Sequence, residues 1–143
     1  MGGETDDDAL AGQEIADRLV RFSGAHEDVS EARLAAEAYL HDLARVSPPA
    51  EPDRRDDILL VVTELAANTV EYAPGPFELR LSRAFDGVHV VLRDTSPEPP
   101  APRAFDPRRG GRGVGWYLVQ TLSHQVGVIT HERGKDVHVF LPW

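Results

Sequence analysis

The chain has 143 residues, of which 41% are hydrophobic and 27% are charged, so its size and composition are those of one globular domain and exclude a fibrous or fully disordered protein. Its formal net charge of -9 argues against a general role on phosphate backbones, because that affinity comes from surplus lysine and arginine, and we expect no direct nucleic-acid partner. The chain has no cysteine, which excludes disulfide bonds, cysteine zinc sites and thiol catalysis.

Residues 1–28 are predicted to be an acidic N-terminal arm that is partly flexible. Four apolar residues of this arm are spaced as on one side of a short helix: Leu10, Ile15, Leu19 and Phe22. The stretch from Leu19 to Phe22 fits a short strand equally well. The arm lacks the basic and apolar segments of a secretory signal, and no apolar run in the chain reaches the ~20 residues of a membrane span. We therefore expect a soluble, cytoplasmic protein without membrane contacts.

Two amphipathic helices begin the domain that is predicted over residues 29–143. Ser30 is the expected N-cap of the first helix, and apolar residues at helical spacing continue it over residues 31–46, where a Ser-Pro-Pro sequence ends it. The second helix opens at Asp53, has one apolar stripe and ends before Pro74. We expect both helices to bury one side.

A β-hairpin is predicted next, because the hydrophobic period changes from 3.6 to 2. Apolar residues alternate with polar ones on both sides of an Asp86-Gly87 turn, at Phe77, Leu79, Leu81, Val88, Val90 and Leu92. Asp94 continues the apolar face of the second strand. Residues 95–113 then form a long segment rich in proline, arginine and glycine, and loops of that length are usually functional or disordered.

The C-terminal part is predicted to contain one helix and two strands. The helix covers about 114–123, and the strands cover 126–131 and 137–141. Helices segregated from the strands imply an α+β fold, a two-layer α/β sandwich with the helices on one face of a mixed, mostly antiparallel sheet.

The first candidate for chemistry is the pair Glu64 and Asn68 in the second helix. A spacing of four puts the carboxylate and the amide on one helix face at the edge of the apolar stripe. There the amide oxygen could face Mg²⁺ and the carboxylate a proton or a water. The alternative is an ordinary solvated pair on a helix surface. The histidines of the chain show no metal-ligand spacing.

The second candidate is the sequence Gly111-Arg112-Gly113-Val114-Gly115, which leads directly into the predicted third helix. Alternating glycines let the backbone approach an anion, and the helix N-terminus offers unpaired N–H groups, so phosphate is the natural ligand. The sequence fits neither the dinucleotide fingerprint nor the P-loop. The alternative is a flexible loop with a turn that glycine permits.

The third candidate is Asp94 at the end of a strand. An ionised aspartate only accepts hydrogen bonds, so it could bind the exocyclic amine of a purine at the base of a pocket. The alternative is an Asx turn at the strand end.

These three features occur in the order of the N, G1 and G2 boxes of histidine-kinase-like ATPases. More narrowly, the chain resembles the single-domain branch of bacterial anti-sigma factor serine/threonine kinases, of an actinobacterial type. Four stretches carry this resemblance: residues 60–73, 93–97, 111–115 and 134–137. The resemblance implies a Bergerat ATP-binding fold from about Ser30 onward, with ATP and Mg²⁺ as cofactors.

The resemblance also implies a role for each site residue. Asn68 would hold Mg²⁺, Glu64 would act as the general base, and Asp94 would bind the adenine amine. The segment that wraps the phosphates would be an ATP lid made of Gly111, Arg112, Gly113, Val114 and Gly115. Two departures from the family pattern stand out. Ser96 replaces a common glycine, which fits the anti-sigma branch, and Asp136 replaces a frequent threonine.

The implied activity is phosphoryl transfer to a Ser or Thr of an anti-sigma antagonist of the STAS type, by a domain that also sequesters a sigma factor. A monomer and a homodimer are both consistent with the sequence. Two other interpretations stay open, a non-catalytic ATP-binding or protein-sequestering module of the same fold, and an ATPase module of another signalling complex.

Overall fold

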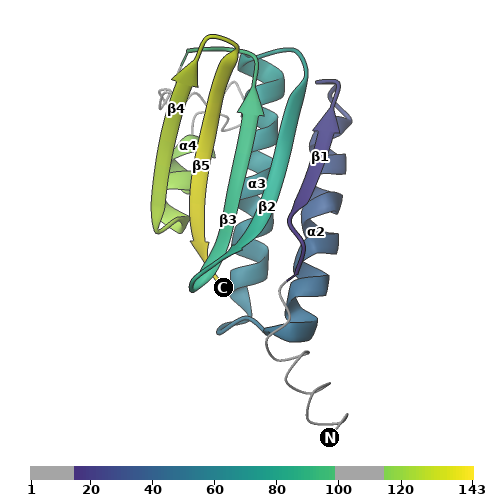
Figure 1. Ribbon diagram of the computed structural model, residues 1–143, viewed down its shortest axis with the longest axis vertical. Coiled ribbons are helices and arrows are strands. Elements are labelled where there is room, and N and C mark those ends of the chain that lie inside the picture. The colour runs from purple at the N-terminus through teal and green to yellow at the C-terminus, as the bar shows by residue number, and fades with distance from the viewer. Residues whose placement is uncertain (1–14, 99–114) are drawn as a thin grey trace, which may run out of the picture.

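A computed structural model describes residues 15–98 and 115–143, which form a layer of helices packed on one face of a sheet (Figure 1). In chain order the elements are β1 Arg18–Phe22, α2 Asp28–Val46, α3 Asp53–Tyr72, β2 Phe77–Ala84, β3 Gly87–Asp94, α4 Gly115–Leu122, β4 Gln125–His131 and β5 Gly134–Pro142. The five strands lie in the order β1-β2-β3-β5-β4. The predicted α+β two-layer sandwich is confirmed.

Every pair of neighbouring strands in the described part of the chain is antiparallel, so this sheet lacks the parallel pair that a mixed sheet would contain. The reason is the position of the last hairpin. The chain crosses from β3 through α4 to the sheet edge, where β4 runs in the same direction as β3. The hairpin turn then returns β5 between β3 and β4, opposite in direction to both.

Helices α2 and α3 form as their apolar periodicity predicts, and both bury one side in the core. The predicted N-cap was wrong, because α2 begins at Asp28 and Ser30 lies inside its first turn. The Asp28 carboxylate accepts the backbone N–H groups of Gly24 and Ala25, each at 2.9 Å, and thereby fixes the loop before the helix. Within the described ranges, no helix has the length and apolarity needed to traverse a bilayer.

The predicted N-terminal arm contains a strand of the sheet. Residues Arg18–Phe22 form β1, which pairs along its whole length with β2, and Phe22 stacks on Phe77 with ring centroids 4.8 Å apart. The short-strand alternative is therefore the observed one, and the folded unit begins before residue 29. Residues 1–14 of the arm lie outside the described residues.

Strand β3 is central to the sheet and alternates strictly between the two faces. Val88, Val90, Leu92 and Asp94 are all buried on the face that the helices cover. The two-residue loop of the preceding hairpin is Phe85-Asp86, one residue earlier than predicted, because Gly87 already pairs with Ala84. Asp94 is therefore a charged group at the end of an apolar row, facing the helix layer.

One buried tyrosine hydroxyl of the described core lacks a hydrogen-bond partner. Tyr39 in α2 is fully buried, and its OH has no hydrogen-bond partner in the described structure. Burial raises the pKa of this phenol to about 12. Because a buried hydroxyl without a partner keeps its desolvation cost, we expect Tyr39→Phe to stabilise the protein by about 1 kcal/mol in urea unfolding. Tyr117→Phe, which alters an exposed tyrosine of α4, should change nothing. A clear loss of stability in Tyr39→Phe alone would show that the hydroxyl is satisfied in solution.

Candidate functional site

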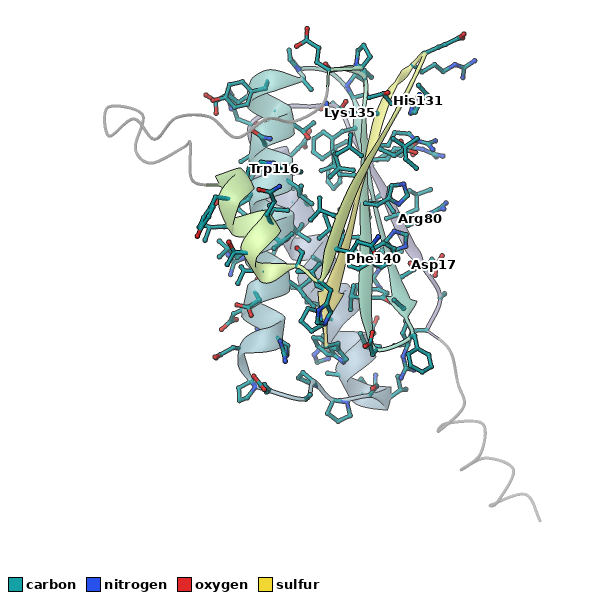
Figure 2. The ribbon with its side chains drawn as sticks, turned by 90° about the vertical axis from the view of Figure 1, so that its left-hand side faces the viewer. Asp17, Arg80, Trp116, His131, Lys135 and Phe140 are labelled. Carbon is teal, nitrogen blue, oxygen red and sulfur yellow. The ribbon has the colours of Figure 1, made fainter. Side chains whose placement is uncertain are left out.

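Four chain segments meet at one end of the molecule: the C-terminal turns of α3, the end of β3, the start of β5 and the loop between α3 and β2 (Figure 1). A methyl group built on Gly75 in that loop would lie 3.0 Å from Thr95 Oγ1, just beyond the end of β3. Figure 2 views the two layers edge-on, with Lys135 near this end of the sheet and Trp116 at the start of α4 in the helix layer.

Glu64 and Asn68 lie one helical turn apart in α3, and both are partly buried. Neither side chain has a hydrogen-bond partner among the described residues. Burial raises the pKa of the Glu64 carboxyl above its ordinary value of 4.5. A desolvated carboxylate with no partner is poised to accept a proton or approach a cation, which an ordinary solvated surface pair is not.

The start of α4 faces Glu64 closely. Gly115 is the first residue of α4, and a methyl group built on it would lie 2.3 Å from Glu64 Oε2. Only a glycine therefore leaves room for the carboxylate at this helix N-terminus. The other predicted lid residues, Gly111, Arg112, Gly113 and Val114, lie outside the described residues.

Asp94 is buried and uses both of its oxygens. Oδ1 accepts the backbone N–H of Ser96 at 2.8 Å, which is the Asx turn considered above, and Oδ2 pairs with Lys135 Nζ at 2.8 Å. The Lys135 ammonium also donates to the Ser96 carbonyl at 3.2 Å. The side chain predicted to bind a purine amine is thus one half of a buried ion pair.

Lys135 is the site residue that the sequence reasoning missed. It stands directly opposite Asp94 in the β3–β5 register and is only 5% exposed. A signal for it existed in the sequence, because Lys135 continues the inward row formed by Val137, Val139 and Leu141. A charge at an inward strand position needs a partner, and Lys135 is the single lysine of the chain.

Asp136, the departure noted in the sequence, points away from the site. Neighbouring residues of a strand face opposite sides, so Asp136 lies on the outer face, where Arg93 binds it through two hydrogen bonds of 2.8 and 2.9 Å. This contact holds the pKa of Asp136 below its usual value. The Arg93–Asp136 pair therefore stabilises the pairing of β3 with β5 on the outer face of the sheet, whereas Lys135 lies on the face that the helices cover.

The helix layer covers one face of an antiparallel sheet and places Glu64 beside Gly115, the first residue of α4. Residues 22–140 match the model of the histidine kinase-like ATPase domain, so the chain belongs to this family of ATP-binding regulatory domains. The structure is similar to the histidine kinase domain from the Erythrobacter litoralis EL346 blue-light activated histidine kinase, with a TM-score of 0.48 and 16% sequence identity over 96% of this chain and 68% of that chain. No curated protein matches the sequence.

Gly115 offers a direct test of the site geometry. In Gly115→Ala the new methyl group would meet the flexible end of Glu64, so we expect the carboxylate to move while the fold persists. The methyl group and the displaced carboxylate would crowd the N-terminus of α4, so Mg-ATP affinity measured by calorimetry should fall about tenfold, with a melting temperature close to that of the wild type. Gly127→Ala is the matched control, because nothing lies within 4 Å of its methyl group. Equal ATP affinity in the two variants would contradict the contact between Glu64 and α4.

Proposed function

We propose that this domain is an anti-sigma-factor-like serine/threonine protein kinase, which transfers the γ-phosphate of Mg-ATP to a Ser or Thr of an antagonist protein. The observation that carries the proposal is the desolvated Glu64 carboxylate, one turn before Asn68 and against the N-terminus of α4. A protein that only binds nucleotide has no need of a partly buried carboxylate at this position that has no partner among the described residues.

The donor set suits Mg-ATP. Carboxylate and amide oxygens are the ligands that Mg²⁺ prefers, and Asn68 would hold the ion. Gly115 is the first residue of α4, and the N-terminus of a helix favours the binding of phosphate. When bound, Mg-ATP supplies the phosphoryl group and the charge neutralisation that its transfer requires.

Glu64 would act as the general base. The acceptor hydroxyl oxygen forms a bond to the γ-phosphorus, the bond from that phosphorus to the bridging oxygen of ADP breaks, and the hydroxyl proton passes to Glu64. Burial raises the pKa of Glu64, which makes the carboxylate a stronger base than an exposed glutamate.

The proposed partners follow from the resemblance of four sequence stretches to anti-sigma factor kinases. The acceptor would be a STAS-type antagonist protein, and a sigma factor would be the protein that the domain sequesters. The net charge of -9 is compatible with a basic partner surface.

Calorimetric titration with ATP, with and without Mg²⁺, tests the nucleotide part of this proposal. We expect micromolar, Mg-dependent binding by the wild type and its loss in Asn68→Ala. Gln125→Ala removes an exposed amide on β4 and should bind like the wild type. Failure of the wild type to bind ATP would refute the proposal.

The transfer reaction needs a second assay, with γ-labelled ATP and the STAS-domain proteins of the same organism as acceptors. Phosphate on a single Ser or Thr of one acceptor, located by mass spectrometry, is the expected result. ATP binding without transfer to any of these acceptors would favour the non-catalytic module.

A further inference from the structure

The ion pair between Asp94 and Lys135 joins the two central strands at the candidate nucleotide site. The two residues are direct cross-strand partners and face the helix layer, with exposures of 3% and 5%. Buried ion pairs are costly to desolvate and add little stability compared with apolar residues of the same size. A buried pair at a ligand site therefore calls for an explanation beyond stability.

The ion pair of Asp94 and Lys135 leaves part of its hydrogen-bonding capacity unused. The Lys135 ammonium has three N–H donors. In the described structure the Ser96 carbonyl accepts one of them at 3.2 Å, and Asp94 Oδ2 lies 2.8 Å from Nζ as its ion-pair partner. With a second donor and one lone pair of Oδ2 assigned to the ion pair, one N–H of Lys135 and one lone pair of Oδ2 remain. One free donor and one free acceptor thus lie on atoms 2.8 Å apart.

We propose that Lys135 is a second base-reading residue, which donates to the ring N1 of adenine while the 6-amine of the same base donates to Asp94 Oδ2. This inference rests on the proposed ATP binding and assigns a specificity-determining role to Lys135. The edge of adenine presents a donor next to an acceptor, which complements the free acceptor and donor of the pair.

The test compares ATP with 1-deaza-ATP, in which a C–H group replaces N1, on the wild type and on Lys135→Met. We expect the wild type to bind ATP about tenfold more tightly than 1-deaza-ATP, and Lys135→Met to bind the two equally. Arg80→Met is the matched control, because Arg80 is an exposed cation on the outer face of the sheet (Figure 2). It should keep the tenfold preference.

Each other outcome has a distinct meaning. A wild type that binds ATP and 1-deaza-ATP equally overturns this inference and leaves the proposed function intact. A tenfold preference that survives in Lys135→Met also overturns it, because another group then reads N1. A wild type that binds neither nucleotide overturns both. If Lys135→Met does not fold, the double variant Lys135→Met with Asp94→Asn removes both charges, and it should likewise show no preference between the two nucleotides.

Discussion

Gly134→Ala is expected to lower the melting temperature of the domain by roughly 10 °C, a loss of about 3 kcal/mol or more. Gly134 has a φ of +146°, which L side chains rarely adopt. A methyl group built there would lie 1.9 Å from the Asp94 carbonyl oxygen and 2.9 Å from Thr95 Cα. These are backbone atoms of the last residue of β3 and of the residue that follows it, so the collision cannot be relieved by rotating a side chain.

The control for this prediction is Gly127→Ala on the neighbouring strand β4. Its methyl group would meet nothing within 4 Å, and we expect a change within about 0.5 kcal/mol of the wild type. Thermal unfolding followed by circular dichroism measures both variants. A Gly134→Ala protein as stable as Gly127→Ala would show that β3 and β5 separate at this end at little cost.

Glu64→Gln is expected to lower the rate of phosphoryl transfer by about 10²- to 10⁴-fold, because the amide cannot accept the hydroxyl proton. Mg-ATP affinity should change far less than in Asn68→Ala, since the general base is needed only during transfer. Single-turnover transfer to the acceptor protein measures the rate. Asp56→Asn, on the exposed first turn of the same helix, should leave it unchanged.

The pH dependence of Glu64 supplies an independent check. Because burial raises the pKa of Glu64, the wild-type rate should fall on the acid side with a midpoint above 4.5, and this limb should be missing in Glu64→Gln. The fold favours the protonated form, so the stability contributed by this group is fully present below its unfolded pKa and is lost as the pH rises through the folded pKa. Glu64→Gln should therefore match the wild type in stability at acid pH and exceed it at neutral pH. The same stability difference at both pH values would contradict the burial of the carboxylate.

Local patterns predicted most of the fold. The two long helices and the hairpin of β2 and β3 have enough residues for their periods of 3.6 and 2 to be distinguished. Strand β1 has only five residues, and at that length the same apolar spacing fits a helix or a strand. Its pairing with β2 decides between them, and that contact joins residues about sixty positions apart.

The sequence predicted individual residues of the candidate site, but it did not predict all of the contacts that these residues make. The spacing of Glu64 and Asn68 is a property of one helix, so the shared face follows from sequence alone. The ion pair of Asp94 and Lys135 depends on the register between β3 and β5, which the position of the whole last hairpin determines. Tertiary topology of this kind has no local periodic signal.

The strand order has a consequence for synthesis on the ribosome. Among the five strands that the structure describes, β5 is synthesised last, yet it lies between β3 and β4. Until β5 emerges from the ribosome, one edge of β3 has unpaired backbone groups, and the Asp94 carboxylate lacks its counter-ion. An unpaired strand edge is a template for aggregation. We therefore expect a translation product that stops before Gly134 to be bound by chaperones or degraded by proteases.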